Sequence, residues 1–305
     1  RLEEFELPEI KDDEILVKVM SDSICMSTYK LVKQGKKHKR APQNIDTNPI
    51  IIGHEFAGDI VKVGAKWADQ FKPGQKFAQQ PALNYKGSLA SPGYSYEFFG
   101  GACTYCIIPN EVMELGCLLN YDGDSYFEAS LGEPMSCIIG GYHANYHTNK
   151  QNYNHSMGTK RDGNIIVMGG CGPMGLGAVS YGLCMENKPK RLVVTDISDD
   201  KIKRAREVIS EEAAKEAGVE LHYVNTASMK NPIAELMAIT NGHGYDDVFI
   251  YIPNKQVVAM GDALLAFDGC MNFFAGPTDN QFKGEINFSP FSFYLLTNAK
   301  NNGII

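Results

Sequence analysis

The stretch NIIVMGGCGPMG (residues 164–175) decides the fold of this chain. An apolar run rich in β-branched residues, typical of a buried strand, leads directly into a glycine turn. The turn fits G-x-G-x-x-G through Gly170, Gly172 and Gly175, with Pro173 and Met174 between the last two glycines. An apolar segment with helical character follows over 173–187. Strand, glycine turn and helix in this order predict the first half of a βαβ unit.

Glycines at these three positions have a chemical use. A side chain would keep the backbone from approaching a pyrophosphate, and the following helix offers free N–H groups and a positive dipole end. A second apolar strand ends at Asp196, 196 − 170 = 26 residues after the first glycine. An acid at this place accepts from a ribose 2′-OH and repels a 2′-phosphate. The motif predicts a dinucleotide site with NAD(H) preferred over NADP(H), although Lys201, Lys203 and Arg204 lie nearby. A tight turn and a helix cap are the ordinary alternative.

The pattern continues on both sides of this unit. Strands are predicted over 191–198, 245–252 and 269–276, with a helix over 199–218, which indicates a doubly wound parallel sheet. Before it, short β segments broken by Gly and Pro are predicted over 15–21, 53–64, 74–80 and 102–109. A helix over 133–147 joins the halves, and the polar stretch 147–163 is expected to be a surface loop. We therefore predict an α/β protein with two domains, 1–135 and 136–305.

Composition excludes several classes of protein. The 305 residues are 44% hydrophobic and 21% charged, as in globular domains, so disorder is not expected. The formal charge is 29 − 36 = −7, which gives no general attraction for nucleic acid. No apolar run is long enough for a membrane span, and the first ten residues lack a signal-like core. The eight scattered cysteines form no dense framework and fit reduced thiols in a cytoplasmic protein.

Residue types that bind zinc are present but widely spaced. Cys25, His54, Glu55 and Glu133 offer thiolate, imidazole and carboxylate groups, which zinc accepts. The separations of 54 − 25 = 29 and 133 − 54 = 79 residues match no compact metal motif. A single cysteine is usually a small buried apolar residue, and a glutamate before proline usually begins a helix. Spacing alone leaves a shared metal site open.

An ordered set of motifs gives more information. GHE-x-x-G spans 53–58 and contains His54, F-x-P-G-x-K-F spans 71–77, an acidic Glu-Pro pair follows at 133–134, and G-x-G-P-x-G-L spans the glycine turn. In this order they resemble the zinc-dependent medium-chain dehydrogenases, and the sorbitol dehydrogenase branch in particular. The segments QPALNYKGSLASPGYSYEFFGG (80–101) and LGEPMSCIIGGYHANYH (131–147) are most similar to the L-sorbose-1-phosphate reductases. The resemblance covers nearly the whole chain.

The resemblance implies a GroES-like β-barrel catalytic domain and a Rossmann domain, with one catalytic zinc between them. It implies that Cys25, His54 and Glu133 hold the zinc, with Glu55 as an alternate or water-mediated ligand, and that Ser27 begins a proton relay. Two positions depart from the family pattern. Thr28 replaces an aspartate that usually supports the metal site, and Lys30 stands where alcohol dehydrogenases often have a relay histidine, which puts the later relay members in doubt.

Cys103 and Cys106 form C-x-x-C, which raises the question of a second zinc. In a strand over 102–109, residues three apart would face opposite sides of the sheet. No second C-x-x-C supplies the remaining ligands of a structural site. We therefore expect two buried thiols and no structural zinc.

A dense basic run, Lys36 to Arg40, stands out in an acidic chain. Most such runs are solvated loops. This run lies shortly after Cys25, however, and the resemblance independently implies a phosphorylated substrate. Lys39 and Arg40 are therefore candidates to bind a substrate phosphate.

The expected function is hydride transfer between NAD(H) and a sugar phosphate or polyol, with reduction of L-sorbose 1-phosphate to D-glucitol 6-phosphate preferred. An unphosphorylated polyol or threonine-type dehydrogenase is the second interpretation. A zinc-free dinucleotide-binding protein with a regulatory or structural role is a third, from another class. The family implies a homodimer or homotetramer. Because the chain ends at NNGII, where relatives continue back to the catalytic domain, we expect further residues at this end and no return to that domain within the chain.

Overall fold

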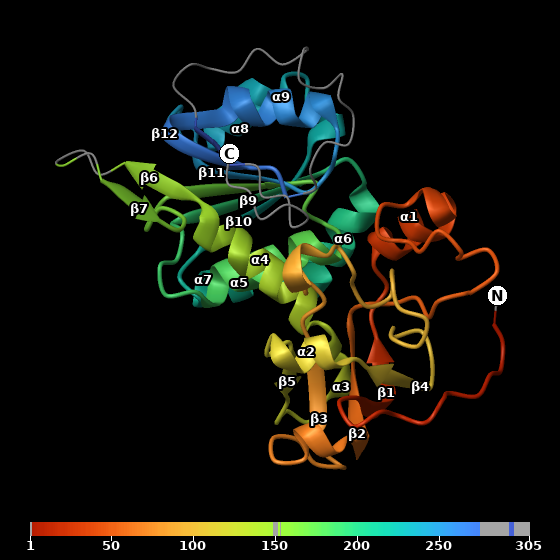
Figure 1. The fold of residues 1–305 in the computed structure, drawn as a ribbon. Helices are drawn as coiled ribbons and strands as arrows, with labels where there is room; N and C mark the ends of the chain where they lie inside the picture. The colour runs from red at the N-terminus through yellow and green to blue at the C-terminus, as the bar shows by residue number, and fades with distance from the viewer. Residues whose placement is uncertain (1, 149–151, 153, 275–292, 296–305) are drawn as a thin grey trace. The chain divides into compact units, whose positions relative to one another are not determined.

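The structure is a computed structural model, and it describes residues 2–148, 152, 154–274 and 293–295. The chain divides into two compact units, Arg1–Pro134 and Met135–Ile305, and the division falls within one helix (Figure 1). Within the described residues, no helix is long and apolar enough to cross a membrane.

The first unit is built on an antiparallel sheet with the strand order β4-β1-β2-β3-β5. Apolar side chains at alternate positions, such as Ile15 and Val17, are fully buried, and they pack with Phe56, Phe77 and Ile108 in one core. The five strands are β1 Ile15–Asp22, β2 Phe56–Val63, β3 Lys76–Gln79, β4 Tyr105–Ile108 and β5 Leu118–Asn120.

Short helices connect these strands. The first of them begins at Met26, shortly after β1 ends, and fixes the backbone at its N-cap residue, Cys25. The helices are α1 Met26–Gln34, α2 Asn110–Glu114 and α3 Tyr126–Ser130, with single 3-10 turns at Gly35–Lys37, Ala65–Trp67 and Tyr85–Gly87. Helix α4, Gly132–Ala144, begins in the first unit and ends in the second.

The second unit contains a parallel sheet of six strands in the order β10-β9-β8-β11-β12-β13. The order reverses between β8 and β11, as in doubly wound dinucleotide-binding folds. The predicted α/β class with a Rossmann sheet is confirmed. The strands are β8 Asn164–Met168, β9 Arg191–Asp196, β10 Glu220–Asn225, β11 Tyr245–Ile250, β12 Leu265–Asn272 and β13 Phe293–Leu295.

Alternation along the central strands separates two cores. Ile165 and Val167 of β8 face a core that includes residues of α4, α5, α6 and α7. Ile166 and Met168 face the opposite core, which includes α8 and α9 (Figure 1). Because both faces are covered, the strands read as continuous apolar runs. The helices are α5 Pro173–Cys184, α6 Asp199–Val208, α7 Glu211–Glu216, α8 Pro232–Ile239 and α9 Lys255–Leu264.

Two local predictions were wrong. The helix expected over 199–218 is broken between α6 and α7, because Ser210 caps a new helix by accepting a hydrogen bond from the Ala213 N–H. The stretch 147–163 is not only a loop, because β6 Tyr146–Thr148 pairs antiparallel with β7 His155–Met157. The strand predicted over 269–276 extends beyond residue 274 and so lies partly outside the described residues.

A buried ion pair ties β6 to the parallel sheet. His147 Nε2 donates to Asp247 Oδ1 at 3.1 Å, and His147 Nδ1 donates to the backbone carbonyl of Asp268 at 3.1 Å. Both partners only accept, so the ring carries both protons. Burial alone would lower the pKa of His147, but these hydrogen bonds and the charges of Asp247 and Asp268 raise it overall. Asn145 also donates to Asp247 at 2.6 Å.

This ion pair predicts a pH dependence of stability. A histidine whose pKa is raised on folding stabilises the protein fully below its unfolded pKa of about 6.5, and the stabilisation is lost as pH rises through the folded pKa. We expect the urea midpoint of the second unit to fall as pH rises above about 6.5 and through the raised pKa of His147. His147→Gln should cost about 3 kcal/mol at pH 6 and flatten this pH profile. An unchanged slope in the variant would assign the pH dependence to other groups.

Candidate active site

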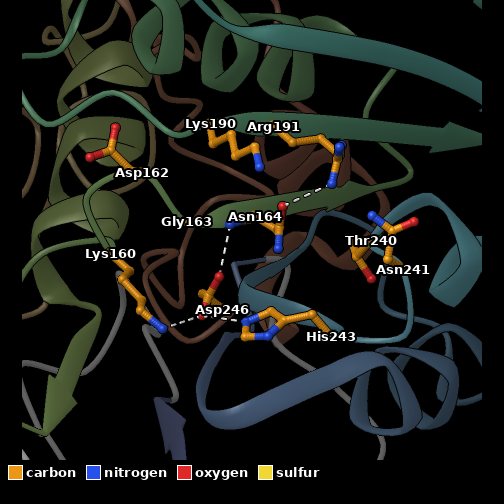
Figure 2. A pocket seen from close by; sticks show the side chains of 10 residues that line it. All are labelled: Lys160, Asp162, Gly163, Asn164, Lys190, Arg191, Thr240, Asn241, His243 and Asp246. Carbon is orange, nitrogen blue, oxygen red and sulfur yellow. Dashed lines mark hydrogen bonds and ion pairs between the residues drawn. The ribbon is translucent and has the colours of Figure 1, made fainter.

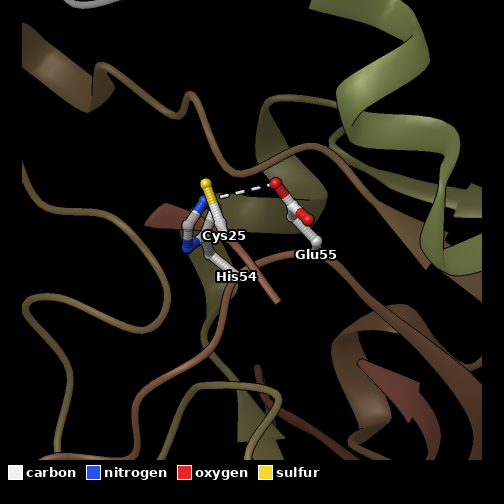
Figure 3. Close-up of side chains that lie close together, drawn as sticks. All are labelled: Cys25, His54 and Glu55. Atoms are coloured by element: carbon white, nitrogen blue, oxygen red, sulfur yellow. Dashed lines mark ion pairs between the residues drawn. The ribbon is translucent and has the colours of Figure 1, made fainter. Parts of the chain in front are cut away.

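Three predicted site residues come together in the first unit. Cys25, His54 and Glu55 each offer one ligand atom, and these atoms lie within 4.8 Å of one another (Figure 3). His54 Nε2 is 3.9 Å from Glu55 Oε1. His54 and Glu55 are only 5% and 6% exposed, whereas Cys25 is half-buried. Among the described residues, no other group of three or more His, Cys, Asp or Glu side chains has this arrangement.

The fold brings these residues together at adjacent strand ends. Cys25 follows the end of β1 and is the N-cap of α1, while His54 and Glu55 directly precede β2, which is the antiparallel partner of β1. Gly53 makes this approach possible, because its φ is +90° and a Cβ there would lie 2.2 Å from Asp22 Oδ2. A gap of 29 residues in the sequence therefore becomes a local cluster.

Hydroxyl groups orient both buried ligands. Thr28 Oγ1 is 3.3 Å from His54 Nδ1. When Nδ1 carries the ring proton and donates a hydrogen bond to Thr28, Nε2 is unprotonated and faces Glu55. Thr28 thus occupies the supporting place where the family pattern has aspartate. Ser23 donates to Glu55 Oε2, which turns the other carboxylate oxygen towards His54.

Ser27 lies at the centre of this group. Its Oγ is 2.9 Å from Cys25 Sγ and 3.3 Å from His54 Nε2. The hydroxyl of Tyr94 donates to Ser27 Oγ at 2.6 Å. Burial raises the pKa of Tyr94 to about 12, so the phenol remains a donor at neutral pH. Sequence reasoning missed Tyr94, which lies in the segment 80–101 that was used only for the resemblance.

The donor set of the cluster fits zinc. Sulfur, nitrogen and oxygen ligands are those that zinc takes, and ligand atoms on one zinc stand about 2.0–2.3 Å from it, so small side-chain movements would bring these three onto one ion. Burial raises the pKa of the Cys25 thiol, and a bound cation would oppose this effect. Glu133 is not in the cluster; it lies in the first turn of α4, and its charge acts on Tyr94.

The prediction that Cys103 and Cys106 face opposite sides of one strand is wrong. Strand β4 begins at Tyr105, so alternation does not separate the two thiols. Cys106 is fully buried, and burial together with its contact with the Cys103 side chain raises the pKa of the Cys106 thiol. Cys103 also donates from Sγ to the Gly100 carbonyl. The two thiols therefore lie side by side.

The basic run does not act as one surface. Lys36 is paired with Asp46 at 2.8 Å, and Lys39 is exposed. Arg40 is half-buried and lies over the ring of Tyr94, 5.4 Å from its centroid. No hydrogen bond or ion pair joins the Arg40 guanidinium to any residue that the structure describes, and its Nε is buried. Arg40 is therefore a cation available to an anion.

The glycine turn has the geometry of a dinucleotide site. A Cβ at Gly170 would lie 2.7 Å from Val167 and Val194 side chains, and a Cβ at Gly175 would lie 2.2 Å from the Gly170 carbonyl. These two glycines therefore allow close packing of α5 against the turn. A Cβ at Gly172, by contrast, would have no protein atom within 4 Å. Gly172 is the N-cap of α5 and Pro173 its first residue, so this open space lies at a helix N-terminus.

Asp196 ends β9, next to β8, which leads into the turn. It is 6% exposed, and its Oδ1 accepts from the backbone N–H groups of Ile197 and Ser198 at 2.8 and 3.2 Å. These contacts fix the carboxylate and leave Oδ2 to accept from a ribose. The helix-cap alternative is wrong, because Ser198 is the N-cap of α6 and its side chain accepts from the Lys201 N–H.

A pocket of about 320 Å³ lies elsewhere, at the amino ends of β8, β9 and β11 (Figure 2). Its charged groups are largely neutralised within the protein. Lys160 and His243 both contact Asp246, and Arg191 pairs with the Glu220 carboxylate at 2.7 Å. Because ligands of doubly wound sheets bind at the carboxyl ends of the strands, this pocket is not the cofactor site.

Comparisons with known proteins agree with this geometry. Residues 11–117 match the alcohol dehydrogenase GroES-like domain. Mannitol-1-phosphate 5-dehydrogenase of Aliivibrio fischeri is 52% identical over 94% of this chain and 68% of the relative. L-sorbose 1-phosphate reductase of Klebsiella pneumoniae is 45% identical over 99% of this chain and 73% of the relative. A zinc-binding dehydrogenase from Sinorhizobium meliloti, solved bound to NADP, has a similar fold, with a TM-score of 0.68 at 20% identity over 93% of this chain and 75% of that one.

The fold and the cluster define the class of protein as a two-domain oxidoreductase with a GroES-like domain and a Rossmann domain. The chain belongs to the zinc-dependent medium-chain alcohol/sorbitol dehydrogenase family, whose members are oxidoreductases acting on CH–OH groups. The predicted family, fold class and enzyme class are confirmed, together with the coarser assignment to the sugar-phosphate and polyol dehydrogenases.

Proposed function

We propose that this protein is a zinc- and NAD(H)-dependent oxidoreductase of sugar phosphates that reduces L-sorbose 1-phosphate to D-glucitol 6-phosphate. The observation that carries the proposal is the cluster of Cys25, His54 and Glu55 with the Ser27 hydroxyl beside it. Cys25, His54 and Glu133 would hold one zinc, with Glu55, which the structure places in the cluster, as an alternate or water-mediated ligand. The first unit is the catalytic domain, the second binds the cofactor, and the Cys103–Cys106 pair holds no structural zinc.

The chemistry follows from these groups. When bound, a zinc ion would supply Lewis-acid polarisation of the carbonyl oxygen, and a nicotinamide would supply the hydride. Ser27 Oγ accepts from Tyr94, so its own proton is left to donate. In reduction, Ser27 relays a proton from solvent to the substrate oxygen, and in oxidation it relays the substrate's proton in the opposite direction. Thr28 keeps His54 Nδ1 protonated, and Ser23 keeps Glu55 turned towards the cluster.

Arg40 is proposed to bind the substrate phosphate. A sugar phosphate brings almost two negative charges to a chain of formal charge −7 and therefore needs a local cation. Arg40 lies over the same tyrosine whose hydroxyl contacts Ser27, and its guanidinium has no acceptor among the described residues. Lys39, which is exposed, adds only a peripheral charge.

This assignment predicts a selective defect. Arg40→Ala should raise KM for L-sorbose 1-phosphate about tenfold or more, since one charge-assisted contact is worth roughly 1.5–3 kcal/mol. The matched variant Lys39→Ala should change KM by less than about threefold. Both variants should reduce unphosphorylated L-sorbose like wild type. Equal kcat/KM for the two sugars in the unmutated enzyme would contradict the phosphate site.

A second substrate is favoured by one specific comparison. The relative that is 52% identical carries the name mannitol-1-phosphate 5-dehydrogenase, in which the reacting carbon is distant from the phosphate. In L-sorbose 1-phosphate the carbonyl and the phosphorylated carbon are neighbours. D-fructose 6-phosphate and L-sorbose 1-phosphate should therefore be compared as oxidants of NADH, with D-fructose and L-sorbose as controls. A higher kcat/KM for D-fructose 6-phosphate would move the proposal to the mannitol phosphate reaction.

Cofactor choice gives a further prediction. With Oδ1 fixed by two backbone N–H groups, Asp196 Oδ2 should accept from the ribose 2′-OH and repel a 2′-phosphate. We expect kcat/KM for NADH to exceed that for NADPH, and Asp196→Ala to narrow the ratio about tenfold or more. Lys201, Lys203 and Arg204 are exposed on α6 and would favour NADPH once Asp196 is removed. A larger kcat/KM for NADPH in the wild type would show that Asp196 does not contact the ribose.

A further inference from the structure

Tyr94 makes several contacts around the cluster, and the family resemblance assigned it no role. It is 3% exposed, and its hydroxyl donates to Ser27 Oγ at 2.6 Å across 67 residues of sequence. Its ring lies 5.0 Å from the ring of His54 and 5.3 Å from the ring of His38. The Arg40 guanidinium lies above the same ring, 5.4 Å from the centroid. One side chain thus contacts a candidate metal ligand, the Ser27 hydroxyl and the candidate phosphate cation.

We propose that Tyr94 is a positioning residue with two separable roles: its hydroxyl fixes the direction in which Ser27 donates, and its ring supports the Arg40 guanidinium. The proposal rests on the proposed function, because Ser27 and Arg40 act there on the carbonyl oxygen and the phosphate.

The hydroxyl role follows from counting donors and acceptors. Ser27 Oγ has one proton and accepts the proton of Tyr94. Its own proton then points away from Tyr94, towards the space near Cys25 Sγ and His54 Nε2. Without the Tyr94 hydroxyl, Ser27 Oγ keeps Cys25 Sγ and His54 Nε2 as neighbours but loses the donor that holds its own proton on their side. The expected loss lies in kcat, since Ser27 serves proton transfer and does not hold the phosphate.

The ring role follows from the contacts of Arg40. Its backbone N–H donates to His38 Nδ1 at 3.3 Å, and its carbonyl accepts from Ser95 at 2.8 Å, so the backbone is fixed on both sides. The guanidinium lies over the face of Tyr94 and makes no hydrogen bond or ion pair with a residue that the structure describes. Removing the ring takes away this support and a cation–π attraction. The expected loss lies in KM for the phosphorylated substrate.

Two substitutions separate the roles. Tyr94→Phe keeps the ring and removes the hydroxyl, so kcat should fall about tenfold or more while KM for L-sorbose 1-phosphate stays within about twofold. Tyr94→Leu removes both and should also raise that KM at least about threefold, with little change in KM for L-sorbose. Tyr96→Phe is the matched control, because Tyr96 also donates a hydroxyl, to Glu111 at 2.7 Å, and packs against Phe99 away from Ser27.

A spectroscopic measurement gives a readout besides turnover. In the cobalt-substituted protein, the thiolate-to-cobalt absorption of Cys25 should shift in Tyr94→Phe and in Ser27→Ala alike, because both change the hydrogen bond at Sγ, and it should not shift in Tyr96→Phe. Zinc content and thermal midpoint of Tyr94→Phe should match those of Tyr96→Phe. If the wild type is active and Tyr94→Phe keeps both its kcat and the cobalt spectrum, the positioning role is wrong. A wild type that reduces no sugar or polyol would contradict the proposed function instead.

Discussion

Cys25→Ala should lower kcat/KM for L-sorbose 1-phosphate about a thousandfold or more. The variant would lose a zinc ligand and with it several kcal/mol of Lewis-acid stabilisation of the transition state. The ligand atoms of the cluster lie within 4.8 Å of one another, and Cys25 supplies its one thiol. No second thiol of the cluster can therefore replace this ligand. NADH affinity, measured by fluorescence titration, should change by less than about twofold, since the glycine turn belongs to the other unit.

Cys117→Ala is the matched control for this substitution. Cys117 is also a half-buried thiol of the first unit, and its weak contact is with the Leu115 carbonyl. The control should keep full activity and zinc content, and His54→Ala should behave like Cys25→Ala. Turnover by Cys25→Ala at the wild-type rate would contradict a role of the cluster in catalysis.

Gly172→Val should weaken NADH binding about a hundredfold or more while leaving the fold intact. A Cβ at Gly172 meets no protein atom within 4 Å, and the backbone there is extended, with φ −90° and ψ 175°. A valine would therefore fit the protein but occupy the space in which a pyrophosphate approaches the N-terminus of α5. Gly172→Ala should give a smaller loss in the same direction.

Two other glycines serve as controls for this experiment. Gly140 on α4 is also open, so Gly140→Ala should change neither NADH affinity nor folding. Gly175→Val should fail differently, since a Cβ there would lie 2.2 Å from the Gly170 carbonyl and must displace α5. Of these variants, only Gly172→Val should lose NADH binding while keeping the thermal midpoint of the wild type. Unchanged NADH affinity in Gly172→Val would contradict a cofactor site at this turn.

Predictions from local sequence succeeded where all the residues that define a structural unit lie in one continuous segment. The unit from Asn164 to Asp196 contains its strands, turn and helix in sequence, so periodicity and glycine spacing were sufficient. The same periodicity missed the break at Ser210, because a helix cap inside a continuous helical pattern changes no apolar position. It also missed β6 and β7, whose described residues are largely polar and pair with each other.

The candidate site depends on contacts between distant residues, which spacing does not reveal. Cys25 and His54 meet because β1 and β2 are antiparallel neighbours, and the sequence alone left their shared metal site open. Tyr94 reaches Ser27 from an irregular segment whose position no periodicity predicts. The family resemblance supplied the ligands and Ser27 but not Tyr94. The sequence also could not show which of Lys39 and Arg40 is the better candidate for the phosphate. The structure distinguishes them by their burial and by the contact of Arg40 with the Tyr94 ring.

The central claim is that one zinc at the Cys25–His54 cluster supports reduction of a sugar phosphate by NADH. The most direct measurement determines zinc by elemental analysis and NADH oxidation with L-sorbose 1-phosphate on the same metal-replete sample, before and after chelation and zinc readdition. We predict one zinc per chain, activity lost with the zinc and restored on readdition. Full activity in metal-free protein would contradict the claim, and two zinc ions per chain would place a second metal at Cys103 and Cys106.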